Sequence, residues 1–141
     1  MMSVVLATAW NPRGELVRFL RFLDLLEDEY AGMAISLPPG AETRVVDTLR
    51  DLAGFVSVAV TPDWSWGRHL ALEKALENPC DYIHYTDFDR LLRWVETSTK
   101  EWRKTVRSIP QFECLVIGRT KKAYETHPEA IRRTEAISNL V

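Results

Sequence analysis

The sequence predicts one α/β domain over residues 1–141, with a mostly parallel sheet and helices on both of its faces. Three observations lead to this prediction. Apolar runs of strand length alternate with segments whose apolar residues recur at helical spacing. The connections between these segments are short, and several are marked by proline or glycine. Strict alternation of this kind is typical of right-handed crossover units, which place successive strands parallel in one sheet.

Three strands and two helices are expected in the first half of the chain. The apolar run VVLATAW predicts a buried strand at 4–10, and the leucine-rich periodic segment after it predicts a helix at 15–30. GMAISL predicts a second strand at 32–37, which the following Pro-Pro-Gly ends. The valine and leucine spacing at 42–53 predicts a second helix, and FVSVAV predicts a third strand at 55–60.

The second half continues the alternation. RHLALEKALE predicts a helix at 68–77, and DYIHYTD predicts a strand at 81–87. A longer helical region follows at about 91–108, and ECLVIGR predicts a fifth strand at 113–119. A last helix is expected over 128–141, because its proline fits the first turn. That helix ends on apolar residues with neither a cap nor a polar tail, so we expect a domain that is incomplete at its C-terminus.

Composition and charge limit the classes of function. A chain of 141 residues that is 46% hydrophobic and 27% charged is long enough for one soluble globular core. Its net charge of −2 gives no general attraction to nucleic acid, so we expect no nucleic-acid partner. Cys80 and Cys114 form no motif, which suits the reducing cytosol. The first apolar run lacks a basic lead-in and ends at Asn11, so we expect neither a signal peptide nor a membrane span there.

The carboxyl ends of parallel strands share one edge of the sheet, and ligands bind there. That edge is expected to carry the loops TAWNPRG, LPPG, TPDWSWG and TDFD. Asp87 and Asp89, in the last loop, stand two residues apart, and oxygen ligands of this kind suit Mg²⁺ or Mn²⁺ together with substrate phosphates. The alternative is a turn in which one aspartate caps the helix that starts near Arg90. His84, inside the preceding strand, is interpreted as a core or interface histidine rather than as a ligand.

Three segments carry a resemblance to a known family. TAWNPRGELVRFLRFL is similar to an opening in which the first strand runs into a T-Y-N-E-x-x-x-L loop and helix. SWGRHLALEKALENPCDYIHYTDFD is similar to a stretch that ends in D-x-D, with Gly67, Ala71 and Ala75 in register. VIGRTKKAYETHPEAIRRTEAISNLV echoes a later G-S-R … R-R … N-L segment. On these residues the chain resembles the family-2-type glycosyltransferases with the Rossmann-like GT-A fold, and within them the dolichol-phosphate-mannose-synthase-like group.

The resemblance implies a metal-dependent glycosyltransferase, of which this chain is the nucleotide-sugar-binding half. The donor is then a nucleotide-diphosphate sugar, the cofactor is Mg²⁺ or Mn²⁺, and the acceptor is a polyprenyl phosphate or another molecule. Asp89 is expected to bind the metal directly, while Asp87 takes the ribose or a metal-bound water. The metal neutralises the diphosphate leaving group as a Lewis acid. Such an enzyme is expected in the cytoplasm, free or associated with a membrane.

The resemblance places further residues near the nucleotide. Trp10 and Asn11 follow the first strand, where Trp10 either stacks on the base or packs against the core. Arg13 either meets a phosphate or remains a solvated loop arginine. Asp63 either substitutes for a base-binding acid or is an ordinary turn residue. Arg68, at the start of a helix, offers its backbone amide and its side chain to phosphate.

Two departures from the family leave other functions open. The chain has LPPGAE where the family carries an aspartate pair, and the family's general base and acceptor loops lie beyond the point where this chain nearly ends. The alternative is therefore a catalytically inactive nucleotide-sugar-fold module for binding or assembly. A weaker alternative is a haloacid-dehalogenase-like phosphohydrolase, which also uses D-x-D. Those enzymes usually carry it on the first strand with a small residue after it, whereas Arg90 follows here.

Two surfaces predict contacts with partners. KEWRKTVRSI places four cations at helical spacing, so this helix lies either on an anionic membrane or in solvent as an outer face. The last predicted helix carries apolar side chains that need a partner, and Trp64 and Trp66 occupy a loop at the ligand-binding edge. Exposed apolar surface of this extent usually marks an interface. We therefore expect a homodimer, either packed or exchanged, that forms through the last helix.

Overall fold

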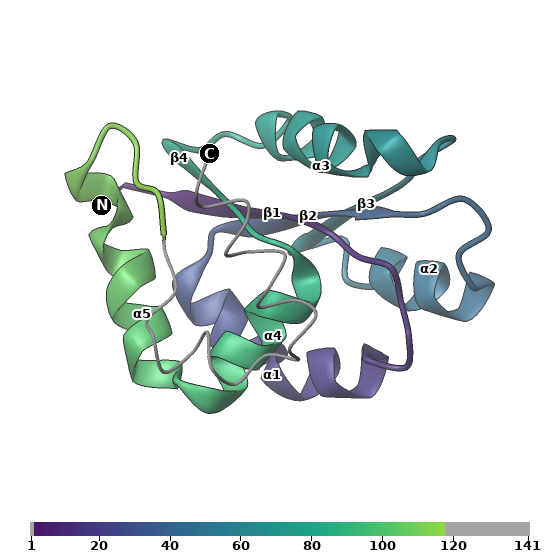
Figure 1. Cartoon of the computed structure of the whole chain (residues 1–141), viewed down its shortest axis with the longest axis horizontal. Coiled ribbons are helices and arrows are strands. Elements are labelled where there is room, and N and C mark those ends of the chain that lie inside the picture. The colour runs from purple at the N-terminus through teal and green to yellow at the C-terminus, as the bar shows by residue number, and fades with distance from the viewer. Residues whose placement is uncertain (1, 118–141) are drawn as a thin grey trace, which may run out of the picture.

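Four parallel strands form the central sheet of the computed structural model, which describes residues 2–117 (Figure 1). In chain order they are β1 (Val4–Ala9), β2 (Gly32–Leu37), β3 (Val56–Val60) and β4 (Tyr82–Tyr85). Across the sheet the order is β3-β2-β1-β4, so that β1 lies between β2 and β4. All three pairings are parallel, and the predicted α/β class with a parallel sheet is confirmed.

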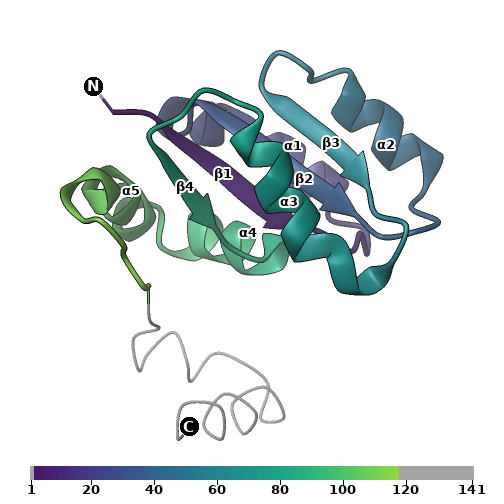
Figure 2. The same ribbon diagram turned by 90° about the horizontal axis from the view of Figure 1, so that it is seen from above.

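Helices cover both faces of this sheet (Figures 1 and 2). One face carries α1 (Leu16–Glu29), α2 (Thr43–Arg50), α4 (Phe88–Thr97) and α5 (Thr99–Ser108). The other face carries α3 (Gly67–Leu76), which the short 3-10 helix η1 (Trp64–Trp66) precedes, and a second 3-10 helix, η2 (Ile109–Gln111), follows α5. Within the part of the chain that the structure describes, no helix is long and apolar enough to cross a membrane.

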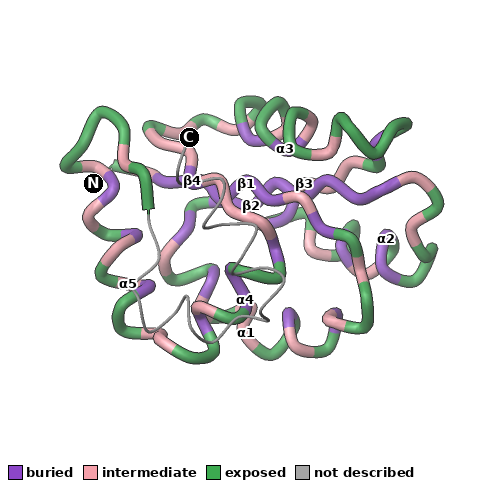
Figure 3. The backbone as a smooth tube through the Cα atoms, in the orientation of Figure 1, coloured by how far each residue is buried: buried purple, intermediate pink, exposed green. Residues whose placement is uncertain are grey.

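The two faces of the sheet are packed with side chains of different size. Val4 and Leu6 of β1 face the four-helix side, where the core includes large residues such as Phe19 and Trp102. On the opposite side, small side chains let α3 lie close to the strands; these are Val5, Ala7, Ala34, Ala71 and Ala75. The buried course of the strands between the helical layers is visible in Figure 3. The alternation of inward and outward side chains along each strand therefore serves two separate cores.

The predicted helical region at 91–108 begins earlier and consists of two helices. α4 starts at Phe88, and Ser98 both ends α4 and precedes α5. The hydroxyl of Thr97 donates to the carbonyl of Arg93 (2.7 Å), and the hydroxyl of Thr99 donates to the carbonyl of Val95. Hydroxyl side chains that bond to nearby carbonyls compete with the helical pattern. The Thr-Ser-Thr run thus gives a local reason for the break.

The fifth predicted strand is not formed over the residues that the structure describes. Residues 113–117 have an irregular backbone, in which Leu115 packs against the core while Val116 is 87% exposed. An apolar run becomes a strand only where a neighbouring strand pairs with it, and propensity alone does not supply that pairing. Within residues 2–117, β4 accordingly pairs with β1 alone. Residues 118–119 and the predicted last helix at 128–141 lie outside the described part of the chain.

The winding of the sheet reverses between β1 and β4. β2 and β3 are added on one side of β1, and β4 is then added on its other side. α3, which connects β3 to β4, lies on the face opposite α1 and α2, as right-handed crossovers require when the direction of winding changes. In open parallel sheets, ligands bind beyond the carboxyl ends of the strands at such a reversal. This position is therefore where a site is expected.

Candidate functional site

The first turn of α3 lies over the ends of β1 and β2, and the end of β4 lies beside β1. The amide of Thr86 donates to the carbonyl of Ala7 (3.1 Å), which holds the end of β4 against β1. The hydroxyl of Ser36 donates to the carbonyl of Gly67, and a Cβ on Gly67 would lie 3.8 Å from that of Ala9. The start of α3 is thus fixed over the carboxyl ends of the two central strands.

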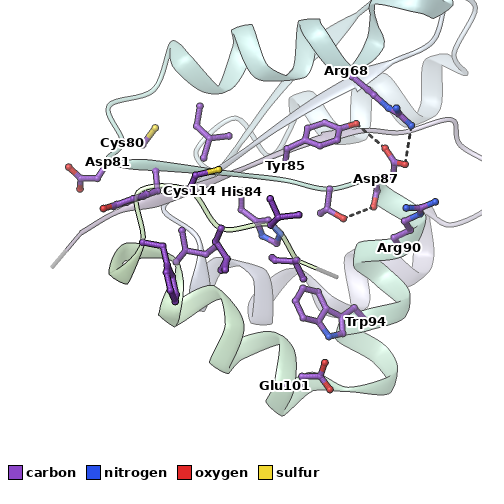
Figure 4. Close-up of a pocket in the computed structure, with 18 of the residues that line it drawn as sticks. Arg68, Cys80, Asp81, His84, Tyr85, Asp87, Arg90, Trp94, Glu101 and Cys114 are labelled. Carbon is purple, nitrogen blue, oxygen red and sulfur yellow. Dashed lines mark hydrogen bonds and ion pairs between the residues drawn. The ribbon is translucent and has the colours of Figure 1, made fainter. Parts of the chain in front are cut away.

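Asp87 and Arg68 form an ion pair at this edge (Figure 4). Arg68 Nη2 lies 3.3 Å from Asp87 Oδ2, and the hydroxyl of Tyr85 donates to Asp87 Oδ1 at 2.9 Å. Asp87 occupies the N-cap position of α4, but its side chain makes no capping hydrogen bond. The carboxylate is instead turned toward α3. Asp87 therefore stands where a helix-capping residue stands, as the capping alternative predicted, but its side chain does not cap the helix.

Tyr85 fixes the orientation of the Asp87 carboxylate. Burial, and after it the hydrogen bond to Asp87, raise the pKa of the Tyr85 hydroxyl well above its ordinary value. The hydroxyl therefore stays protonated and remains a donor to Asp87. The arginine side chain is the more exposed partner of the pair, at 72% against 26% for the side chain of Asp87.

Asp89 does not join Asp87 in one site. Its Oδ1 accepts from the backbone amide of Arg90 (2.9 Å), and it is absent from the residues that line the adjacent cavity, which include Asp87. Both oxygens of Asp87 already accept hydrogen bonds from Arg68 and Tyr85. Over residues 2–117, no group of three or more His, Cys, Asp or Glu side chains is arranged to hold a metal ion. This donor set does not fit an ion held jointly by both aspartates.

The other residues predicted at the nucleotide lie in different surroundings. Trp10 is 3% exposed and stacks on Phe88, with ring centroids 4.3 Å apart, so its ring belongs to the core. Asp63 caps η1, because its Oδ1 accepts from the amide of Ser65 (2.9 Å) and from its hydroxyl (3.0 Å). These hydrogen bonds lower the pKa of Asp63. The observed contacts thus match core packing for Trp10 and a turn residue for Asp63, rather than contacts with a nucleotide.

The loop after β1 remains open to solvent. Asn11 and Arg13 are both exposed, and the amide of Arg13 donates to the carboxylate of Glu15. Neither side chain contacts the Arg68–Asp87 pair in the described structure. The two side chains are thus free of the pair, and neither lines the cavity beside it.

A cavity of about 1120 Å³ extends from this pair along the outer edge of β4 (Figure 4). Its walls come from β4, from α4, from η2 and from the irregular segment after η2. The apolar part of the lining consists of Leu76, Ile83, Trp94, Ile109, Phe112, Leu115, Val116 and Ile117. Cavities of about 300–1,000 Å³ hold drug-sized ligands, so this one is large enough for a small organic molecule.

His84 belongs to the wall of this cavity and to a buried hydrogen-bonded chain. Its Nδ1 lies 2.8 Å from the hydroxyl of Tyr30, which also accepts from Trp102 Nε1 at 3.1 Å. Burial lowers the pKa of His84 to about 4, so the imidazole is neutral near pH 7. The sequence predicted a core or interface histidine at His84 but did not indicate the chain, since its members come from β4, the end of α1 and α5 and share no local motif.

The cationic surface of α5 is partly neutralised by α1. Arg107 forms two hydrogen bonds to Glu29 (2.8 Å and 3.1 Å), and Arg103 lies 3.4 Å from the same carboxylate. Arg103 also lies 3.6 Å from Asp28. Two of the four predicted cations thus hold α5 against α1, which favours the outer-face alternative over a membrane surface. Membrane contact stays a prediction.

The dimer prediction also stays a prediction. Trp64 and Trp66 are 64% and 54% exposed, as that prediction requires. The helix through which the contact was expected lies outside the described residues.

Comparisons with known proteins give no relative. No family model, no curated protein sequence and no solved structure matches this chain. The resemblance to the family-2-type glycosyltransferases therefore stays a prediction from the motifs, and a functional proposal has to rest on the fold and on the geometry of the site.

Proposed function

We propose that this domain binds a nucleotide-diphosphate sugar, as the donor-binding half of a glycosyltransferase-like enzyme. The observation that carries the proposal is the Arg68–Asp87 pair at the carboxyl ends of the strands, where the winding of the sheet reverses. This is the position at which open parallel sheets bind nucleotides.

Arg68 is suited to the diphosphate. Its guanidinium is planar and always charged, and it can bind two phosphate oxygens at once. The side chain is 72% exposed and its ion pair with Asp87 is 3.3 Å long, so it can turn toward a ligand at little cost. Asp87, held by Tyr85, then accepts hydrogen bonds from hydroxyl groups of the ribose or the sugar.

A divalent metal at Asp87 and Asp89 remains a prediction from the resemblance. In our proposal Arg68 supplies the positive charge near the diphosphate, because the two carboxylates do not converge on one point. The polyprenyl-phosphate acceptor and the cytoplasmic or membrane-associated location are likewise retained as proposals that follow from the resemblance.

A catalytically inactive binding module is the second candidate. The observation that favours it is the position of Asp89, which accepts from the neighbouring amide of Arg90 and does not line the cavity, so that Asp87 lacks the second acid that the resemblance expects beside it. A transfer assay separates the two candidates. Release of sugar from a bound donor supports the enzyme, and stoichiometric binding without release supports the module.

A thermal-shift panel tests the proposal itself. Nucleoside diphosphates and their sugars are added to the full chain, with free sugar and inorganic phosphate as controls. Ligands that bind the native state raise the melting temperature by mass action. We expect a rise for at least one nucleoside diphosphate in the wild type and a smaller rise in Arg68→Gln. The matched control is Arg21→Gln, an exposed arginine on α1, on the opposite face of the sheet from α3. No rise with any nucleotide contradicts the proposal.

A further inference from the structure

The cavity along β4 contains a buried polar side chain with one ring nitrogen unused. His84 is 6% exposed and lines the cavity, on the side of β4 where Trp94 lies (Figure 4). Its Nδ1 is engaged by Tyr30. For its Nε2, no hydrogen-bond partner exists among residues 2–117. His84 Nε2 is not among the fully buried atoms that lack a partner, so a molecule in the cavity can reach this nitrogen and hydrogen-bond to it.

The buried chain decides which nitrogen carries the proton. The indole of Trp102 can only donate, so the Tyr30 oxygen is the acceptor of their hydrogen bond. The Tyr30 hydroxyl then has its own hydrogen to place, and His84 Nδ1 is the acceptor within reach at 2.8 Å. Nδ1 is therefore unprotonated, and in the neutral ring the hydrogen is on Nε2. His84 presents an N–H donor to the cavity.

The surroundings of this donor favour an uncharged acceptor. Trp94 packs edge-to-face on His84 (6.4 Å between ring centroids), and Ile109 and Leu115 line the same cavity. An anion placed here would lose its hydration beside an imidazole that burial keeps neutral. An uncharged carbonyl oxygen loses less hydration free energy on entering the cavity, and it can accept the same hydrogen bond from Nε2. The part of the cavity beside His84 and Trp94 is thus suited to an aromatic, largely apolar group that carries a carbonyl.

We propose that this cavity holds the nucleobase of the ligand, and that His84 Nε2 donates a hydrogen bond to a carbonyl oxygen of the base. The inference rests on the proposed function. In this arrangement the base of one nucleotide lies beside His84 and Trp94, and its diphosphate lies at Arg68. Bases with carbonyl groups are then preferred over adenine, which has none.

Nuclear magnetic resonance of the full chain labelled with ¹⁵N-histidine tests this directly. In the free protein we expect His84 to show an unprotonated Nδ1 and a protonated Nε2. Uridine, which lacks phosphates, should shift the Nε2 and Hε1 signals of His84 and leave those of His69, an exposed residue on α3, unchanged. UDP should produce the same shifts at lower concentration.

The outcomes separate the inference from the proposed function. If UDP binds and Arg68→Gln weakens it while the His84 signals stay fixed, the base is elsewhere and the inference is overturned. If uridine shifts the His84 signals but UDP binds no more tightly than uridine, the base site is supported and the diphosphate site at Arg68 is contradicted. If neither ligand binds, the cytidine and guanosine counterparts, whose bases also carry a carbonyl, are titrated in the same way; the base assignment falls if none of them shifts His84, and the proposed function falls if no nucleoside diphosphate of the panel binds.

Two variants add an affinity measurement. His84→Phe removes the donor and should weaken uridine and UDP about tenfold, while His84→Gln keeps an N–H donor and should recover part of that loss. Equal affinity of His84→Phe and wild type would overturn the inference. Where a variant fails to fold, the wild-type spectra still decide.

Discussion

Arg68 Nη2 and Asp87 Oδ2 lie 3.3 Å apart and join the first turn of α3 to the end of β4. The two residues are far apart in the sequence and meet because α3 crosses back over the sheet at the point where its winding reverses. An exposed pair of this kind contributes less than about 1 kcal/mol to stability. Its position at the carboxyl ends of the strands, where open parallel sheets bind ligands, is the basis of the binding role proposed above.

Neutralising this pair should leave the fold intact. We expect Asp87→Asn to lower the free energy of unfolding by less than about 1 kcal/mol, since the Tyr85 hydroxyl keeps an oxygen acceptor on the amide. Urea unfolding followed by circular dichroism measures the change. A loss of several kcal/mol would mean that the pair is a structural element rather than part of a binding site.

The core position of Trp10 predicts a large difference between two tryptophans. Trp10→Ala removes a ring that is 3% exposed and stacked on Phe88, and should cost about 3–5 kcal/mol. Trp64→Ala, at a residue that is 64% exposed, should change stability by no more than about 0.5 kcal/mol. The same unfolding experiment measures both. Similar losses for the two variants would contradict the packing described here.

His84 predicts a loss of stability in acid. Its pKa is about 4 in the folded protein against an ordinary value of 6.5, so as the pH falls the unfolded chain takes up the proton first. Stability should therefore decrease below about pH 6.5, by up to about 3 kcal/mol by about pH 4. His84→Gln should abolish this part of the pH dependence. His69→Gln is the control and should retain it; an unchanged slope in His84→Gln refutes the assignment.

Nucleotide binding should not depend on Asp89. Its carboxylate accepts from the amide of Arg90 and does not line the cavity. We expect Asp89→Ala to bind UDP within about twofold of the wild type, with or without Mn²⁺. Twofold corresponds to about 0.4 kcal/mol, and removal of a side chain that does not contact the ligand should change the binding free energy by no more than that. Calorimetry in EDTA and in Mn²⁺ measures this. A loss confined to Mn²⁺ would restore the metal prediction.

The regular part of the fold was predictable because local patterns determine it. Strand-length apolar runs such as GMAISL became strands, and the alternation with helices gave the parallel sheet. The break at Ser98 and the irregular backbone of 113–117 were not predicted. The first depends on side-chain hydroxyl bonds, and the second depends on whether a strand edge accepts the segment, which is a property of the whole fold.

The site was predictable only in part, for a similar reason. The loops at the carboxyl ends of strands were identified, and Asp87 and Arg68 do meet there. The spacing of Asp87 and Asp89 suggested two converging carboxylates, but the start of α4 between them directs the side chains to different partners. The chain from Trp102 through Tyr30 to His84 joins three elements, so no sequence spacing could indicate it.

The most direct test of the central claim compares UDP with uridine in calorimetric titrations of the wild type and of Arg68→Gln. The two ligands share a base and a ribose and differ in the diphosphate, so their ratio of affinities isolates the phosphate contact. We expect Arg68→Gln to weaken UDP about tenfold, as loss of a charge-assisted hydrogen bond should, and to leave uridine unchanged. An equal effect on both ligands, or none on UDP, would contradict a diphosphate site at Arg68.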